Sequence, residues 1–530
     1  MKEFNTAGVC LPSKHYMVDL TERIREIRKL VDAGKYFTIN RARQYGKTTT
    51  LKLLKKTLVQ DYTVLSLDFQ SLEQGVFETG GSFSQAMARI ITDLHEFEGQ
   101  EIPEEILAAF ELLKTSDPKK IKMDELFRIL KRWILSSELP FVLMIDEVDS
   151  AANNQVFLDF LAQLRDGYNH RDSDGIPAFQ SVILAGVTDV KHLKVKIRDE
   201  DQSKVNSPWN IATDFIIDMS LSEEGIQGML DEYEADHHTG MDTCEIAKLL
   251  HDYTSGYPFL VSRLCQLLDT RVSSVISDPA TVWSRTGMDE AVKLLLSEDN
   301  TLFQSLTGKL TNNPELRAAL RSILMEGERI SYNAQQETIS LMQMYGFIRN
   351  DRGTIRISSR IFETVLYNFF LSDEELRNNS FTREGDLAKN IFIQDRKLNV
   401  RLILEHFIKT YTEVFGPLED RFKEKDGREL FLLYLKPIIN DTGNYYIEAE
   451  TRNQRRTDVI IDYLGRQYII ELKIWQGERY NEEGEQQLRD YLEYYSLTTG
   501  YMLSFNFNKK KQVGVERVEI DDKVIYEGIV

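Results

Sequence analysis

The chain has 530 residues, of which 42% are hydrophobic and 28% are charged, and its formal net charge is −19 at pH 7. The length predicts three or four domains. No apolar run approaches the length of a membrane span, and the net charge argues against a chain coated with cations for nucleic acid, although it allows a local basic groove. Residues 1–20 lack the apolar core of a secretory signal. Three cysteines without metal-ligand spacing, Cys10, Cys244 and Cys265, indicate reduced thiols, so we expect a cytoplasmic protein.

A strand, a loop and a helix are predicted in succession between residues 35 and 58. The first segment is β-prone, with apolar side chains at Tyr36, Phe37 and Ile39. The loop closes with Gly46-Lys47-Thr48, and leucines at helical spacing follow. This order is the phosphate cradle of nucleotide-binding proteins. Gly46 would let the backbone approach a phosphate, Lys47 would bind the β- and γ-phosphates of ATP, and the Thr48 hydroxyl would hold Mg²⁺.

The second half of this site is predicted at the end of the apolar run Phe141–Ile145. A near-continuous apolar run is expected of a parallel strand that is buried on both faces. The run ends in Asp146, which would hold Mg²⁺ through water, and Glu147, which would polarise the attacking water. The Gly-Lys-Thr sequence alone is equally consistent with an ordinary turn before a helix. Together with the Asp-Glu strand, it favours a nucleotide site.

Three further strands are predicted over 62–68, 181–186 and 215–217, and helices are predicted over 83–98, over 104–137 and around 157–164. Strands that alternate with helices form a parallel α/β sheet with the ligand at the carboxyl ends of its strands. We expect one strand to lie between the cradle strand and the Asp-Glu strand, the order of the additional-strand type of P-loop ATPase. Thr188, after the strand 181–186, would sense the γ-phosphate or cap a helix.

The pattern from about residue 222 to 275 is helical throughout. A helix end at Gly256 and a new start at Pro258 are predicted, and this stretch resembles the Gly-x-Pro element of the helical lid in signalling and origin-recognition-type ATPases. Arg263, one turn further on, is a candidate phosphate sensor or a surface arginine.

Two helices and a hairpin over 314–370 resemble a winged helix, with the hairpin turning at Asp351-Arg352-Gly353. DNA binding is one interpretation of this unit. A packing module beside the ATPase is favoured, because the second helix is poor in Lys and Arg. The charged stretch 373–386 is the expected boundary to the next domain.

The C-terminal region carries a second set of acidic and basic residues. Asp458 opens one predicted strand, and Glu471 lies on the return strand of a hairpin that turns near 464–466, so the two carboxylates are expected to meet. With the carbonyl of Leu472 they would form an oxygen-rich Mg²⁺ site. Lys473 shares the strand face of Glu471 and would orient a water or stabilise negative charge.

Two helices would complete this set, Glu429 from the helix before the strands and Gln487 from the helix after them. The alternative interpretation is a charged strand edge on which Glu471 and Lys473 are exposed. Apolar residues flank Asp458 and Glu471, which favours burial, and a buried carboxylate needs a partner.

The motifs together resemble a bacterial and archaeal fusion of an AAA-ATPase-like domain with a C-terminal PD-(D/E)XK nuclease-superfamily domain. The N-terminal likeness covers about residues 5–230, and the C-terminal likeness covers about 390–515 and includes 469–475, 480–484 and 500–506. Family members similarly carry the loop Arg41-Ala42-Arg43-Gln44-Tyr45-Gly46-Lys47-Thr48. Arg41, which stands where the common P-loop pattern has its first glycine, is therefore a family trait.

The resemblance implies an α/β fold: an ASCE or AAA-like P-loop NTPase domain (1–221), a helical lid (222–312), a winged-helix-like unit (313–375) and a restriction-endonuclease-like PD-(D/E)XK domain (385–530). It implies a metal and catalytic role for Asp458, Glu471 and Lys473, with Glu429 as a further metal ligand. The residues expected to bind the nucleotide are Arg41, Arg43, Gln44, Tyr45, Gly46, Lys47, Thr48, Thr49, Asp146 and Thr188.

The leading hypothesis is an ATP-binding, ATP-hydrolysing protein whose nucleotide state controls a Mg²⁺-dependent nuclease acting on DNA. The second is an ATP-dependent switch whose C-terminal domain only binds a nucleic-acid or protein partner. A DNA-binding ATPase that uses the winged-helix-like unit is a third and weaker hypothesis. ATP is the expected partner, DNA is a candidate partner, no membrane is expected, and the oligomeric state stays open.

Overall fold

The structure is a computed structural model that describes residues 2–152, 154–187, 208–325, 330–375, 380–395, 397–415, 424–439, 443–446, 459–464, 466–474, 485–486, 488–493, 495–506 and 512–530. The chain divides into two compact units. One comprises Ala7–Ser220, and the other comprises Met1–Thr6 with Leu221–Val530. Among the described residues, no helix combines the length and the apolar character that crossing a bilayer requires.

The unit Ala7–Ser220 is built on a parallel sheet of four strands in the order β3-β6-β5-β4. Strand β6 lies between the cradle strand β3 and the Asp-Glu strand β5, so the predicted strand order is confirmed. The elements of this unit are β2 (His15–Tyr16), α1 (Thr21–Asp32), β3 (Tyr36–Asn40), α2 (Lys47–Leu58), β4 (Thr63–Asp68), η1 (Gln74–Phe77), α3 (Gly80–Glu98), α4 (Glu104–Thr115), α5 (Met123–Ser136), β5 (Phe141–Asp146), η2 (Val148–Ser150), α6 (Gln155–Asp174), β6 (Ser181–Gly186) and η4 (Pro208–Ile211).

Helices cover both faces of this sheet, which explains why its strands are apolar on both faces. In β5, Val142 and Met144 belong to the core formed with α1 and α2, whereas Leu143 and Ile145 belong to the core formed with α3, α5 and α6. All six residues of β5 are buried. The carboxyl ends of β3 and β5 are thereby fixed at one edge of the sheet, where the candidate nucleotide residues begin.

The helical pattern predicted over 104–137 forms two helices, α4 and α5, with a turn around Pro118 between them. The strand predicted over 215–217 was wrong. Residues 215–217 form no strand; the structure has only a single parallel bridge between Thr213 and Phe37. The segment is held by side-chain contacts instead of a strand ladder. The Phe215 ring stacks on Phe37, and the carbonyl of Ile217 accepts a hydrogen bond from the Arg41 side chain.

From Leu221 onward, the second unit continues with helices, as predicted. Helix α8 ends at Thr254, the chain turns through Ser255 (φ 49°) and Gly256 (φ 71°), and Pro258 is the first residue of α9. A Cβ on Gly256 would lie 2.1 Å from the carbonyl oxygen of Leu221, so this turn requires glycine. The elements are β1 (Glu3–Phe4), α7 (Glu223–His237), α8 (Thr243–Thr254), α9 (Pro258–Leu267), the π-helical turn η5 (Leu268–Val272), α10 (Pro279–Val282), α11 (Arg285–Ser297) and α12 (Thr301–Asn312).

Two helices and a hairpin follow, in the order expected from the sequence. They are α13 (Pro314–Met325), α14 (Glu337–Met344), β7 (Ile348–Asp351) and β8 (Thr354–Ile357). The hairpin turns at Arg352 and Gly353, both of which have positive φ. Helices α15 (Arg360–Glu375) and α16 (Ser380–Phe392) continue the chain.

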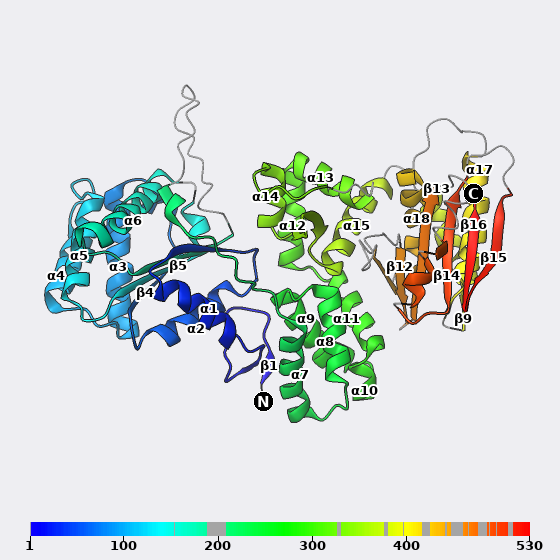
Figure 1. Cartoon of the computed structure of the whole chain (residues 1–530), viewed down its shortest axis with the longest axis horizontal. Helices are drawn as coiled ribbons and strands as arrows, with labels where there is room; N and C mark the ends of the chain where they lie inside the picture. The colour runs from blue at the N-terminus through cyan, green and yellow to red at the C-terminus, as the bar shows by residue number, and fades with distance from the viewer. Residues whose placement is uncertain are drawn as a thin grey trace, which may run out of the picture. The chain divides into compact units, whose positions relative to one another are not determined.

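The C-terminal sheet has six strands in the order β11-β12-β13-β14-β16-β15 (Figure 1). Strands β13, β14 and β16 run parallel, and the others pair antiparallel. Helical residues 488–493 pack on one face, with Leu488, Tyr491 and Leu492 against Ile469 and Met502. The elements are β9 (Ile393–Gln394), β10 (Lys397–Leu398), α17 (Val400–Phe415), α18 (Glu424–Ile439), β11 (Gly443–Tyr446), β12 (Val459–Tyr463), β13 (Arg466–Ile474), β14 (Thr499–Phe505), β15 (Gly514–Ile520) and β16 (Lys523–Ile529).

Candidate functional site

The loop between β3 and α2 has the backbone geometry of a phosphate cradle. Gly46 is the N-cap of α2 and has φ 78°, a left-handed conformation that glycine adopts without strain. Apart from its chain neighbours, no heavy atom lies within 4 Å of where a Cβ on Gly46 would be, so the space beside this residue is open. Helix N-termini present unsatisfied N–H groups and favour anions. The geometry therefore fits a phosphate group.

Lys47 closes this loop from inside. Its side chain is buried, and Nζ donates to the carbonyl oxygens of Arg41 (3.0 Å) and Ala42 (3.1 Å). Burial lowers the pKa of Lys47, while the nearby carboxylate of Glu147 opposes that shift. These two carbonyls thus hold the ammonium group beside the cradle. A bound phosphate would take their place as its hydrogen-bond acceptor.

Thr48 and Asp146 join the two halves of the site. Thr48 Oγ1 donates to Asp146 Oδ2 at 2.6 Å, across a sequence separation of 98 residues. Burial raises the pKa of Asp146, and the hydrogen bond from Thr48 opposes this shift. A hydroxyl and a carboxylate at this distance are oxygen ligands of the kind that Mg²⁺ prefers. The donor set fits the predicted metal.

Glu147 and Asp149 lie beside this pair. Glu147 has φ 53°, a rare conformation for a residue other than glycine, and such strain occurs preferentially at functional sites. Burial raises the pKa of Glu147. Asp149 Oδ2 accepts a hydrogen bond from the backbone N–H of Val187 (2.7 Å), the residue before Thr188. Sequence reasoning missed Asp149, because nothing local distinguishes it from a surface aspartate in a turn.

Some predicted nucleotide residues have other partners in this structure. Arg41 Nη2 donates to the carbonyl of Ile217 (2.9 Å), and the guanidinium lies over the Phe215 ring. Thr49 Oγ1 accepts from the backbone N–H of Cys10 (3.1 Å). Arg43 and Gln44 are exposed, Tyr45 is half-buried, and Thr188 lies outside the described residues. The assignment of these side chains to the nucleotide stays a prediction.

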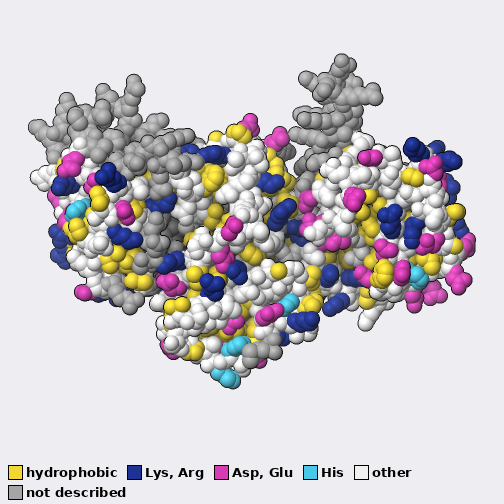
Figure 2. Space-filling model, turned by 180° about the vertical axis from the view of Figure 1, so that it is seen from behind, with side chains coloured by type: hydrophobic (Ala, Val, Ile, Leu, Met, Phe, Trp, Pro, Cys, Tyr) yellow, Lys and Arg dark blue, Asp and Glu magenta, His cyan; other side chains and the backbone are white. Residues whose placement is uncertain are grey.

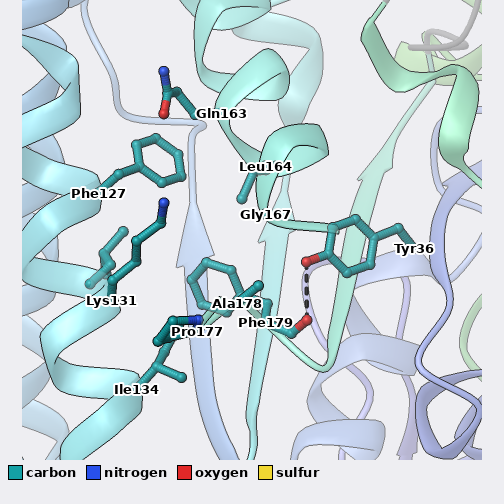
Figure 3. Close-up of a pocket in the computed structure, with 11 residues that line it drawn as sticks. Tyr36, Phe127, Lys131, Ile134, Gln163, Leu164, Gly167, Pro177, Ala178 and Phe179 are labelled. Atoms are coloured by element: carbon teal, nitrogen blue, oxygen red, sulfur yellow. Dashed lines mark hydrogen bonds between the residues drawn. The ribbon is translucent and has the colours of Figure 1, made fainter. Parts of the chain in front are cut away.

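A small pocket lies at the other end of β3, beside Tyr36, the first residue of the strand (Figure 3). The Tyr36 hydroxyl donates to the carbonyl of Phe179 (3.0 Å) within it. Its volume of about 20 Å³ is close to that of one or two water molecules. The pocket is therefore too small for a nucleotide, and the open cradle at Gly46 is the candidate nucleotide site.

The predicted hairpin of the C-terminal domain is confirmed. Strands β12 and β13 pair antiparallel, and Val459 lies opposite Ile470, the sequence neighbours of Asp458 and Glu471. Glu471 and Lys473 are only 2% and 9% exposed, so the alternative of an exposed charged edge was wrong. Asp458 and Gln487 lie outside the described residues. Of the predicted metal and catalytic residues on the two strands, the structure therefore describes those on β13, Glu471 and Lys473.

Two contacts tie the C-terminal domain to helices earlier in the same unit. Glu429 on α18 is half-buried and forms an ion pair with Arg321 on α13 (3.2 Å). Asp462 on β12 accepts a hydrogen bond from the hydroxyl of Tyr253 on α8 (2.6 Å). Sequence reasoning missed the second contact, although a charged residue inside an apolar strand was its signal.

Charges of both signs are interspersed on the face that Figure 2 shows, and the described Lys and Arg side chains do not gather into one continuous surface there. Arg263, the candidate phosphate sensor, donates to Glu298 Oε2 (3.1 Å).

A model of the AAA-like domain matches residues 5–370. The chain belongs to the AAA-like domain family. A second model, of the PD-(D/E)XK nuclease superfamily, matches residues 443–518, so the AAA-like domain is fused to a C-terminal nuclease-superfamily domain. The expected α/β fold, a P-loop ATPase sheet followed by a PD-(D/E)XK domain, is thus confirmed.

Solved structures are similar to this AAA-like chain at low identity. A Walker-type ATPase from Pyrococcus abyssi has 15% identity and a TM-score of 0.46, covering 68% of this chain and 99% of its own. Cdc6p from Pyrobaculum aerophilum has 13% identity and a TM-score of 0.33, covering 70% and 97%. The RuvB Holliday junction branch migration motor of Thermotoga maritima has 13% identity and a TM-score of 0.33, covering 64% and 92%. No curated protein matches the chain.

Proposed function

We propose that this protein binds and hydrolyses ATP with Mg²⁺ at its P-loop, and that its nucleotide state controls a Mg²⁺-dependent nuclease-like domain acting on DNA in the cytoplasm. The observation that carries the first part is the 2.6 Å hydrogen bond between Thr48 and Asp146, the two residues that we propose hold Mg²⁺. Domain bounds at 221, 312 and 375 are part of the proposal, with the winged-helix-like unit as a packing module.

The residues of the ATPase site have distinct tasks. Lys47 holds the phosphates, Thr48 and Asp146 hold Mg²⁺, and Glu147 accepts the proton of the attacking water. Mg²⁺, when bound, neutralises charge on the phosphate oxygens. The pKa of Glu147 is raised by burial, which suits a base that works near neutral pH.

In the nuclease-like domain, Glu471 and Asp458 hold Mg²⁺ and Lys473 acts on the water or the developing charge. Support comes from the burial of Glu471 and Lys473 in the middle of a sheet, where charged groups are costly unless they are paired, hydrogen-bonded or bound to a metal. Glu429 is the weakest member of this set, because its carboxylate is paired with Arg321.

The test of the ATPase assignment is phosphate release by Lys47→Ala protein. Removing the ammonium group should lower turnover on the order of 100-fold or more. Lys55→Ala is the matched control, since Lys55 lies on the same helix and forms an exposed ion pair with Glu98. Hydrolysis by Lys47→Ala at the wild-type rate would contradict the assignment.

The test of the nuclease assignment is cleavage of plasmid and linear DNA in Mg²⁺ or Mn²⁺, with and without ATP. Glu471→Gln and Asp458→Ala should abolish cleavage, whereas Glu519→Gln, an exposed carboxylate on the edge strand β15, should not. Undiminished cutting by Glu471→Gln would remove Glu471 from the site.

A switch whose C-terminal domain only binds a partner is the second candidate function. The Arg321–Glu429 ion pair favours it, because it occupies one carboxylate of the expected acidic set. ATP binding without DNA cleavage under any of these conditions would support this candidate.

A further inference from the structure

Polar side chains extend across three neighbouring strands of the C-terminal sheet. Glu471 and Lys473 lie near the carboxyl end of β13, and the parallel register places Ser504 of β14 directly beside Lys473. Glu527 lies on β16, the next parallel strand, beside Met502. Paired residues on adjacent strands point to the same face of a sheet and are about 5 Å apart. All four polar residues therefore share one face.

These residues gather at the end of the sheet where ligand sites form. Strands β13, β14 and β16 are parallel, and ligands bind at the carboxyl ends of parallel strands. Nearer the amino ends, the same face carries Ile469 and Ile525, which belong to the apolar core. The change from apolar to polar along one face marks the carboxyl edge as different from the rest of the core.

Ser504 and Glu527 form a defined pair within this face. Ser504 Oγ donates to Glu527 Oε1 at 2.9 Å, and the two residues are 0% and 4% exposed. Because the hydroxyl proton is donated to Glu527, the lone pairs of Ser504 Oγ are left to accept hydrogen bonds. Lys473, the register partner of Ser504, carries an ammonium group that only donates.

We propose that Glu527, acting through Ser504, is a positioning residue that holds the Lys473 ammonium group in the nuclease-like site. The inference rests on the proposed nuclease function for its catalytic meaning, and on the geometry of the three strands for its structural part. Glu527 fixes the direction of the Ser504 hydroxyl, Ser504 presents an acceptor to Lys473, and Lys473 is held at the same edge as Glu471.

The catalytic test compares Glu527→Gln with wild type in Mg²⁺-dependent DNA cleavage. A residue that orients a catalytic group from behind should lower kcat on the order of 10-fold to 100-fold with KM nearly unchanged. Glu516→Gln is the matched control: it removes the same charge from the residue opposite Glu527 on β15, where it is exposed. Equal loss in both variants, or no loss in Glu527→Gln, would overturn the proposal.

Ser504→Ala provides a second variant in case Glu527→Gln folds poorly. If the two residues act as a unit, the double variant Ser504→Ala/Glu527→Gln should lose no more kcat than either single variant. Additive losses would mean that Glu527 does not act through Ser504.

A second readout needs no nuclease activity. The rate at which acetic anhydride modifies Lys473 is measured by peptide mass spectrometry, relative to the exposed Lys409. An ammonium group that is no longer held should react several-fold faster in Glu527→Gln and in Ser504→Ala, but not in Glu516→Gln. Unchanged labelling would overturn the proposal even if wild type cuts no DNA. Faster labelling in a protein that cuts no DNA would retain the positioning and reject the nuclease.

Discussion

At the scale of single residues, Arg41 stands within the phosphate-binding motif, but its side chain contacts a segment far along the chain. It occupies the place of the first glycine of the common P-loop pattern, yet its guanidinium contacts the segment 213–220 through Phe215 and the Ile217 carbonyl. The backbone carbonyl of the same residue accepts from Lys47. One residue therefore links the phosphate-binding lysine to the segment that leads out of the ATPase sheet.

Arg41→Ala should loosen this segment more than it weakens ATP binding. A hydrogen bond and a cation–π contact together stabilise by roughly 1.5 kcal/mol, which corresponds to about tenfold faster amide exchange. Hydrogen exchange of residues 213–220 measures this, with Arg25→Ala on α1, an exposed arginine paired with Glu22, as the control. A tenfold loss of ATP affinity with unchanged exchange would instead assign Arg41 to the nucleotide.

The residues that could be predicted from the sequence are those whose signal is local. Gly46, Lys47 and Thr48 are contiguous, and Asp146 and Glu147 end a buried strand, so each half of the nucleotide site carries its own pattern. The contact of Arg41 with Ile217 spans 176 residues, and no local pattern contains it. The Ser504–Glu527 pair joins two strands whose register appears only in the sheet.

At the scale of elements, the contact between α8 and β12 anchors the C-terminal sheet to the helices of its unit. Tyr253 donates to Asp462 at 2.6 Å, and both side chains are buried. Sequence reasoning found α8 from its periodicity and β12 from its apolar run, but the partner of Asp462 lies 209 residues away. A carboxylate inside an apolar strand needs a partner when it is buried, but no local pattern identifies Tyr253 as that partner.

Asp462→Asn tests the energetics of this contact. Burial raises the pKa of Asp462 above its ordinary value of 3.8, and the hydrogen bond from Tyr253 opposes the shift. A raised folded-state pKa means that ionisation destabilises the fold as the pH rises above about 4, whereas asparagine keeps an acceptor for Tyr253 and has no charge. The midpoint of thermal unfolding of Asp462→Asn, relative to wild type, should therefore increase from about pH 4 to about pH 8.

The control for that series is Asp522→Asn, because the Asp522 side chain is 77% exposed in the turn between β15 and β16 of the same sheet. The midpoint of thermal unfolding of Asp522→Asn, relative to wild type, should show little dependence on pH. If the unfolding midpoint of Asp462→Asn relative to wild type instead decreases as the pH rises, the fold stabilises Asp462 in its charged form. In that case the neighbouring arginines, Arg285 and Arg360, outweigh burial.

At the scale of the whole molecule, two families meet in one chain, the AAA-like domain over 5–370 and the nuclease superfamily over 443–518. The fold of each could be predicted because each motif implied a known order of strands and helices. Control of one part by the other stays a hypothesis, because it depends on a difference between nucleotide states rather than on any one motif or set of contacts.

Two variants that both fail to hydrolyse ATP can test whether the nucleotide state controls DNA cleavage by the C-terminal domain. Glu147→Gln removes the base but keeps Lys47, Thr48 and Asp146, so ATP should stay bound while turnover falls on the order of 100-fold. Lys47→Ala should lose the phosphates themselves. If the nucleotide state controls the C-terminal domain, DNA cleavage with ATP must differ between the two variants, because one holds the ATP state and the other the empty state. Equal cleavage by both, measured beside Lys55→Ala, would show that the two parts of the chain work independently.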